Sequence, residues 1–223
     1  MMKFEEFAEL TSRLFPEMTP DMENKFRMME PLYNDWNGKI NVISRKDIGS
    51  LYERHVLHSL AVAGYLKEMR PEIFREWTAG GISVLDLGTG GGFPGIPLAV
   101  MFPEVNFVLC DSVGKKTVVA GGVAEALGLK NVSVVKARAE SLPQTFSHVV
   151  SRAVTALDNF YPWVKGKYTG DIFYLKGGDF SDELCHMMRM ANLRPGSVRT
   201  WKICGWVDSP VFDGKYVIDI PCR

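Results

Sequence analysis

A glycine-rich turn that follows an apolar run constrains this chain more than any other feature. The segment 84–98, VLDLGTGGGFPGIPL, contains five glycines and two prolines. The apolar letters at its start read as a buried strand, and glycine permits turns in which a ligand approaches the backbone closely. In open α/β sheets, ligands bind beyond the carboxyl ends of the strands, where strand order reverses. The turn therefore predicts a ligand site at the end of a parallel strand.

Short apolar runs alternate with helical patterns from Ile82 onward, which is typical of β-α-β units around a parallel sheet. The pattern predicts strands at 82–87, 106–110, 132–136, 146–151, 171–176, 198–204 and 215–220. It predicts helices near 95–102, 113–128, 158–165 and 180–192. No helix is evident between the last two strands, so we expect them to form a close antiparallel pair. Seven strands ending in such a pair indicate the Rossmann-like α/β sheet of class I methyltransferases.

The first eighty residues read as helices instead. Apolar residues recur at helical spacing after a start at Thr19-Pro20-Asp21, and a second periodic run covers 48–66. Asn37-Gly38 indicates a turn between these two runs. Pro71 and the pair Gly80-Gly81 indicate a linker over 70–81. The prediction is an N-terminal helical subdomain, residues 1–75, that caps a ligand-binding domain at 76–223.

The composition excludes several classes of protein. The 223 residues include 26 basic and 26 acidic side chains, so no overall positive field attracts nucleic acid, and any RNA contact must use a local patch. One basic patch without an intervening acid consists of Arg189, Arg194, Arg199 and Lys202. The four cysteines form no C-x-x-C pair, which argues against a zinc site, and the longest apolar run is too short for a membrane span. We expect a cytoplasmic monomer with no metal and no membrane contact.

Two ligands fit the spacing of the glycines. Gly90-x-Gly92-x-x-Gly95 matches a dinucleotide-binding turn, whereas Asp86-x-Gly88-x-Gly90-x-Gly92 matches the turn that binds S-adenosylmethionine. Two prolines in the turn each remove an N–H donor that a pyrophosphate would use, but S-adenosylmethionine has no phosphate. An acid near the strand end also suits the sulfonium and ammonium charges of S-adenosylmethionine. The turn therefore favours this cofactor, and a nicotinamide-dependent oxidoreductase stays as the alternative.

The residues after the fourth predicted strand constrain the methyl acceptor. The segment 149–153, VVSRA, stands where exocyclic-amine methyltransferases have a Pro-Pro-aromatic turn and cytosine-carbon enzymes have a Pro-Cys nucleophile. A nucleophile that already has a lone pair, such as a ring nitrogen of guanine, needs only placement. We therefore expect catalysis by orientation, with no general base.

Several segments together resemble one family. They are YNDWNGKINVISRKD, YERHVLHSL, VLDLGTGGGFPGIPLAVMFPEVNFVLCDSVGKK, AEALGLKNVSVVKARAES, VVSRAVTAL and YLKGG. They run in order from Tyr33 to Gly178 and are similar to the RsmG (GidB) family of bacterial methyltransferases, which form N7-methylguanosine in 16S ribosomal RNA. The resemblance implies a methyltransferase that uses S-adenosylmethionine and acts on 16S rRNA or the small ribosomal subunit. A non-catalytic RNA-binding or assembly protein on the same fold is the remaining alternative.

The glycine turn and the resemblance together assign a cofactor role to individual residues. The expected cofactor-binding residues are Asp86, Gly88, Gly90, Gly92, Phe93, Asp111, Ala139, Glu140 and Arg152. Asp111 follows the second predicted strand and would hold the ribose, while Ala139 and Glu140 would contact the adenine. Arg138 and Arg152 are expected to orient the guanine.

RNA recognition in loops relies on stacked bases and on hydrogen bonds to base edges. The matched segments contain three candidates for RNA contact, Arg54, His55 and Lys176. His55 lies on the apolar stripe of its predicted helix, so a core histidine with satisfied nitrogens is the stronger interpretation. Tyr161 and Trp163, after the fourth predicted strand, are better candidates for stacking on a base than Trp36, which reads as a core residue.

Overall fold

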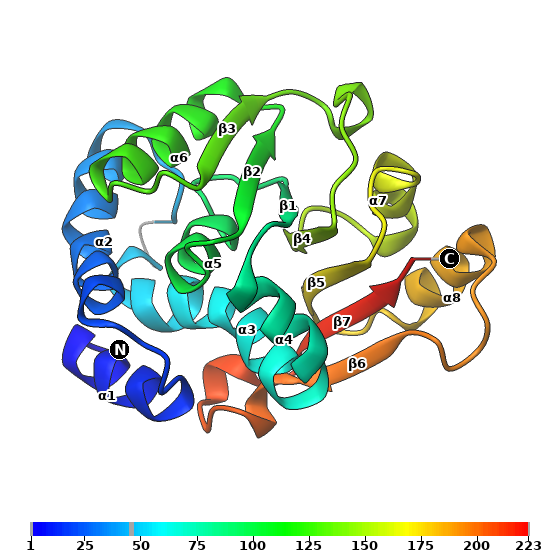
Figure 1. Cartoon of the computed structure of the whole chain (residues 1–223), viewed down its shortest axis with the longest axis horizontal. Coiled ribbons are helices and arrows are strands. Elements are labelled where there is room, and N and C mark those ends of the chain that lie inside the picture. The colour runs from blue at the N-terminus through cyan, green and yellow to red at the C-terminus, as the bar shows by residue number, and fades with distance from the viewer. Residues whose placement is uncertain (1, 45–46, 223) are drawn as a thin grey trace.

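The computed structural model describes residues 2–44 and 47–222, and these form a seven-stranded sheet in the order β3-β2-β1-β4-β5-β7-β6 (Figure 1). The strands are β1 (Ser83–Leu87), β2 (Asn106–Asp111), β3 (Val132–Lys136), β4 (His148–Arg152), β5 (Asp171–Gly177), β6 (Arg199–Lys202) and β7 (Lys215–Pro221). All neighbours are parallel except β7, which is antiparallel to β5 and β6. Strand order reverses between β1 and β4. The predicted seven-stranded methyltransferase sheet with a terminal antiparallel pair is therefore confirmed.

Helices cover both faces of the sheet, because successive strand residues point to opposite faces. Val84 packs in a hydrophobic cluster with α2, α3, α5 and α6, whereas Leu85 packs in a second cluster with α7 and α8. The helices are α1 (Phe4–Leu14), α2 (Pro20–Lys39), α3 (His58–Met69), α4 (Pro71–Ala79), α5 (Gly95–Met101), α6 (Gly114–Ala126), α7 (Leu157–Val164) and α8 (Ser181–Ala191). Among the described segments, no helix has the length and apolar character needed to cross a membrane.

The predicted linker over 70–81 is wrong, because most of it forms α4. Pro71 occupies the first turn of this helix, where proline is well tolerated, and Gly80 follows its end. Ile73 and Trp77 are buried one helical turn apart. The sequence interpretation treated the proline and the glycines as breaks in structure, whereas they mark the two ends of a helix. The expected domain boundary after residue 75 falls inside this helix.

The predicted turn at Asn37-Gly38 is also wrong, since α2 continues through both residues to Lys39. The Asn37 side-chain oxygen accepts hydrogen bonds from the backbone N–H groups of Val42 and Ile43, both at 2.9 Å. Its amide nitrogen donates to the carbonyl of Ile43. Asn37 therefore holds the chain that folds back after the helix, instead of forming the turn itself.

The predicted helix over 48–66 contains a segment with wider winding. Tyr52–Leu57 forms a π-helix that leads directly into α3. Such segments are rare and occur frequently at functional sites. Helical spacing in the sequence predicts a helix here but does not distinguish the π-helical winding.

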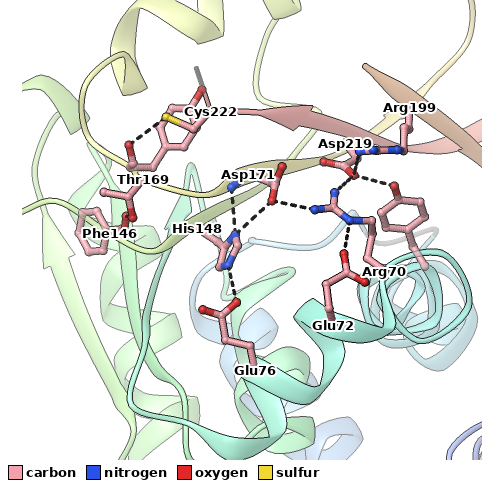
Figure 2. Close-up of polar contacts among 12 residues, drawn as sticks. Arg70, Glu72, Glu76, Phe146, His148, Thr169, Asp171, Arg199, Asp219 and Cys222 are labelled. Carbon is pink, nitrogen blue, oxygen red and sulfur yellow. Dashed lines mark hydrogen bonds and ion pairs between the residues drawn. The ribbon is translucent and has the colours of Figure 1, made fainter. Parts of the chain in front are cut away.

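Charged side chains are paired with one another at the side of the sheet where the parallel strands begin, here called the amino edge (Figure 2). Arg70 lies at the junction of α3 and α4 and forms ion pairs with Asp171 of β5, at 3.3 Å, and with Asp219 of β7. Tyr65 donates a hydrogen bond to Asp219 at 2.7 Å, and Arg199 of β6 lies 3.3 Å from the same carboxylate. The cluster fastens the N-terminal helices to the last strands of the sheet.

Candidate cofactor and substrate site

A cavity of about 560 Å³ opens at the carboxyl ends of β1, β2 and β4, where strand order reverses. Its walls come from the turn after β1, residues 111–113 after β2, residues 137–140 after β3 and residues 152–154 after β4. Trp163 of α7 also lines it. The volume is within the usual range for small-molecule sites. This is the place at which the glycine turn predicted a ligand.

Gly88 brings two of these walls into contact. Its φ of +72° lies in the left-handed region that favours glycine. A Cβ at this position would lie 2.3 Å from a methyl group of Val154, in the loop after β4. The backbone of the first turn therefore lies directly against the fourth-strand loop, and a side chain at residue 88 would push the two apart.

Asp111 ends β2 at the cavity wall, and its carboxylate is held by the backbone. Its Oδ2 accepts from the N–H of Gly90 at 3.0 Å, and its Oδ1 accepts from the N–H of Val113 at 2.8 Å. The side chain is buried, with 7% exposed. Each carboxylate oxygen has two acceptor sites, so the fixed group can still accept hydrogen bonds from a vicinal diol. Asp111 therefore has the position and the chemistry to hold a ribose.

Asp86 lies beneath the same turn and is fully buried, with 0% exposed. Its Oδ2 accepts from the Thr89 hydroxyl at 2.6 Å and from the N–H of Gly95 at 2.7 Å. Among the described residues, its Oδ1 has no hydrogen-bond partner. Burial raises the pKa of Asp86 to about 7. A cation that bound close to this carboxyl would favour its ionised form.

The amino end of α5 is poorly suited to a pyrophosphate. The N–H of Gly95 is bound to Asp86, and the N–H of Ile96 is bound to the carbonyl of Gly92 at 2.7 Å. The next residue, Pro97, has no N–H to donate. A dinucleotide would need free donors at this place. The geometry therefore disfavours the nicotinamide cofactor, in agreement with the interpretation of the prolines.

Arg152 connects the cavity with the N-terminal helices. It ends β4 and lines the cavity, and its guanidinium lies 5.2 Å from the ring centroid of Phe93. Its Nη2 lies 3.1 Å from Nδ1 of His55, and its Nη1 donates to the carbonyl of Arg54 at 3.4 Å. Both of these partners belong to the π-helix. Burial lowers the pKa of Arg152 to about 10, so the side chain stays charged at neutral pH.

His55 is not the satisfied core histidine that the apolar stripe indicated. Because a guanidinium only donates, Nδ1 of His55 must accept, and the proton of the neutral ring must be on Nε2. In the described part of the chain, Nε2 is buried without a partner. Burial, followed by the charge of Arg152, lowers the pKa of His55 to about 3. The ring is therefore neutral near pH 7 and a very weak base.

The structure brings most of the expected cofactor residues together. Those that line the cavity are Gly88, Asp111, Ala139, Glu140 and Arg152, and Arg138, which was expected to orient the guanine, lines it too. Four others lie in or beneath the turn and shape it, namely Asp86, Gly90, Gly92 and Phe93. Trp163 lines the cavity, whereas Tyr161 is buried in the cluster beneath α7 and α8.

The expected RNA-contacting residues differ in their exposure and in their partners. Arg54 is exposed on the π-helix, 3.7 Å from Asp47. The ammonium of Lys176 is instead paired with Glu183 at 2.8 Å and has only 15% of its side chain exposed. In the basic patch, Arg199 begins β6 at the amino edge of the sheet, opposite the cavity.

Two further residues belong to this region but were not singled out as functional. Tyr33 stacks on Phe93 with ring centroids 4.8 Å apart, and its hydroxyl donates to the carbonyl of Gly91 at 2.9 Å. Lys215 begins β7, and its pKa is lowered by burial and by the nearby charges of Arg54 and Arg152. The spacing of Tyr33 indicated only a core position. Nothing in the sequence around Lys215 indicated that it joins cations from two other elements.

Comparison with known proteins places these features in a wider context. The family model GidB, rRNA small subunit methyltransferase G, matches residues 22–205. The chain is 42% identical to Ribosomal RNA small subunit methyltransferase G of Christiangramia forsetii, over 96% of this chain and 97% of the relative. It is 47% identical to a protein of the same name from Bacteroides fragilis, over 83% of this chain and 84% of the relative.

A solved structure has the same fold at low sequence identity. Magnesium protoporphyrin IX methyltransferase from Synechocystis, determined with bound S-adenosylmethionine, superposes with a TM-score of 0.60 at 12% identity. The match covers 92% of this chain and 99% of that chain. The two proteins therefore share the architecture of the sheet and its helices.

Proposed function

This chain belongs to the GidB family, rRNA small subunit methyltransferase G, and on that basis we propose that it methylates N7 of a guanine in 16S ribosomal RNA with S-adenosylmethionine. The observation that carries the proposal is the position of Asp111. Its carboxylate is fixed at the wall of the cavity by two backbone N–H groups, next to the bare backbone of Gly88. This arrangement suits a nucleoside that contributes a ribose diol.

The surroundings of the cavity also suit a positively charged nucleoside. S-adenosylmethionine supplies a methyl group on a sulfonium sulfur. Asp86 has a buried oxygen that lacks a partner among the described residues, and its raised pKa of about 7 makes it responsive to a nearby positive charge. Asp111 adds a second acid at the neighbouring strand end.

The residues around Arg152 favour an acceptor that does not have to lose a proton. Guanine N7 has a free lone pair at neutral pH, so its methylation requires no general base. His55, which contacts Arg152, has a pKa of about 3 and would remove a proton inefficiently near pH 7. Arg152 remains charged and can donate to an acceptor on the edge of the base, such as guanine O6. The protein therefore contributes to the reaction by orienting the base.

The RNA backbone is the expected partner of the cations beside the cavity. Arg54, Arg152 and Lys215 come from three elements. The charges of the two arginines are close enough to lower the pKa of Lys215. Such a local group of cations suits a phosphate chain, even though the whole protein has a formal net charge of +0. The proposal includes action as a monomer, since one chain supplies the walls of the cavity. It also includes action in the cytoplasm, because the relatives are named for ribosomal RNA as their substrate.

The experiment that tests this function compares 16S rRNA from a wild-type strain with rRNA from a strain that lacks the gene. N7-methylguanosine is detected by borohydride reduction and aniline cleavage, and the purified protein with S-adenosylmethionine should restore the lost site. An identical set of cleavage sites in both strains would contradict the proposal. Restoration by a protein that binds no S-adenosylmethionine would instead support the non-catalytic assembly role.

A further inference from the structure

The loop between β4 and α7 forms one wall of the cavity and has an unusual backbone conformation. Ala153 directly follows Arg152 and has a φ of +47°. This left-handed region is unfavourable for a residue with a Cβ. Such a conformation persists only where the surrounding structure imposes it, and it occurs most often at functional sites. The contacts that impose it therefore bear on the function of the loop.

Tyr174 supplies the first of these contacts from β5. Its hydroxyl oxygen accepts from the N–H of Val154 at 3.1 Å and from the N–H of Thr155 at 3.2 Å. Its O–H donates to the carbonyl of Thr155 at 2.8 Å. The tyrosine is fully buried, and its ring lies edge-on against Phe160. A fixed hydroxyl thus makes three hydrogen bonds to two consecutive residues of the loop.

A partly buried ion pair supplies the remaining contacts. Lys176 donates to the carbonyl of Thr155 at 3.3 Å and pairs with Glu183 of α8 at 2.8 Å. Glu183 also accepts from the N–H of Leu157, the first residue of α7. The two charged side chains are 15% and 16% exposed. Lys176, which the sequence suggested as an RNA contact, therefore uses its charge to hold this loop.

The loop lies where a methyl acceptor has to approach the cofactor. Ala153 and Val154 line the cavity next to Arg152. Val154 also lies directly against the turn at Gly88, so the loop and the glycine turn form adjoining walls of the cavity. A change of loop conformation would move Arg152 relative to whatever the cavity holds.

We propose that Tyr174 and the Lys176–Glu183 ion pair are positioning residues, which hold the loop 153–156 in the strained conformation that orients Arg152 and the incoming guanine. This inference rests on the proposed function. Orientation of reacting groups contributes strongly to rates, so small displacements of the loop should lower the rate of transfer more than they weaken cofactor binding.

The first test compares Tyr174→Phe and Lys176→Met with a matched control, Lys67→Met. Lys67 likewise pairs with a glutamate, Glu17, at 2.8 Å and donates to a backbone carbonyl at 3.2 Å, but it is on α3 away from the cavity. For the loop variants we expect kcat with 16S rRNA to fall roughly 10- to 100-fold, with the Kd for S-adenosylhomocysteine within about 3-fold of wild type. The control should retain wild-type kcat, and Lys176→Arg should recover part of the loss.

The second test removes the strain directly with Ala153→Gly. Glycine adopts a positive φ with little strain, so the loop should then need fewer contacts to keep its conformation, and Ala153→Gly added to Tyr174→Phe should recover part of the lost kcat without lowering Tm. A double variant that is no faster than Tyr174→Phe, or equal losses of kcat and of S-adenosylhomocysteine affinity in the Tyr174 and Lys176 variants, would overturn the inference.

Hydrogen exchange separates failure of this inference from failure of the proposed function. The amides of Val154, Thr155 and Leu157 should exchange at least 10-fold faster in Tyr174→Phe and Lys176→Met, and not in Lys67→Met. If wild-type protein methylates no RNA but this exchange pattern holds, the proposed function fails while the holding of the loop stands. If wild-type protein is active and exchange is unchanged in the variants, the positioning role fails alone.

Discussion

The parallel strands begin at the amino edge of the sheet and end at its carboxyl edge. Each of these two sides has a fully buried carboxylate, but the two carboxylates have different partners. At the amino edge, Asp219 accepts from the positively charged Arg70 (Figure 2). At the carboxyl edge, Asp86 accepts only from neutral groups, the Thr89 hydroxyl and the N–H of Gly95. Each carboxylate has one oxygen without a partner among the described residues. The difference therefore lies in the charge of the donors and not in burial.

This difference separates a structural edge from a ligand-binding edge. A buried carboxylate beside a guanidinium is compensated within the protein, and breaking such a pair is strongly destabilising. A buried carboxylate with neutral donors has a raised pKa and gains most from a cation that arrives from outside. We therefore expect substitutions at the amino edge to affect folding and those at the carboxyl edge to affect binding and rate.

The largest expected effect is on stability, from Arg70→Met at the amino edge. Loss of the guanidinium leaves Asp219 buried beside a second acid, Asp171, so the free energy of unfolding should fall by about 3–5 kcal/mol. The matched variant Arg199→Met removes an exposed partner of the same carboxylate and should cost less than about 1 kcal/mol. Urea unfolding measures both. Equal losses in the two variants would remove the distinction between the edges.

The next effect is on rate, from Arg152→Met at the carboxyl edge. The guanidinium lines the cavity and is fixed by His55 and the carbonyl of Arg54, so its loss should disorient the acceptor base. We expect the single-turnover rate to fall on the order of 100-fold. The free energy of unfolding should change far less than in Arg70→Met. A rate within about 3-fold of wild type would show that Arg152 does not orient the base.

A somewhat smaller effect is expected on cofactor affinity, from Asp111→Ala. Loss of hydrogen bonds between the carboxylate and the ribose should weaken S-adenosylhomocysteine by about 1.5–3 kcal/mol. Asp111→Asn should weaken it less, because the amide oxygen can still accept from one of the two backbone N–H groups. Isothermal titration calorimetry provides both values. An unchanged affinity in Asp111→Ala would mean that the ribose lies elsewhere.

The smallest effect is a dependence on pH from Asp86. Its pKa is raised from 3.8 to about 7 in the folded protein, so unfolding releases a proton between these values, and the free energy of unfolding falls as pH rises through that window. A bound cation favours the ionised form, so affinity for S-adenosylmethionine should rise roughly 10-fold from about pH 6 to 8. Asp86→Asn should abolish this rise. Affinity that is independent of pH in wild-type protein would contradict a role for the Asp86 charge.

The rate at saturating cofactor provides the contrast to this affinity. It should be flat between about pH 6.5 and 8.5, because no proton leaves guanine N7 and His55 has a pKa of about 3. A single-proton step that appears in wild type and disappears in His55→Gln would make the histidine a general base.

The residues that the sequence placed beside one cavity, as the structure does, were identified from patterns that are local in the chain. The segment from Asp86 to Pro97 was identifiable because five glycines, two prolines and an acid have fixed spacing within it. Asp111 could be identified because the carboxyl ends of adjacent parallel strands meet at one edge. The predictions at Pro71 and Asn37 were wrong because residue types that favour turns have other roles at helix ends. Pro71 begins α4, and Asn37 accepts hydrogen bonds from the chain that follows α2.

The sequence by itself determined the succession of strands and helices along the chain from Ile82 onward and the chemistry of the first turn, because hydrophobic periodicity and glycine spacing are local properties. Only the tertiary structure decided which charges are compensated. Lys176 pairs with Glu183, seven residues away in the sequence. Arg152 contacts His55 at a separation of 97 residues, and Arg70 pairs with Asp219 at a separation of 149. Compensation depends on distance through space and on burial, and a one-dimensional pattern of charges contains neither.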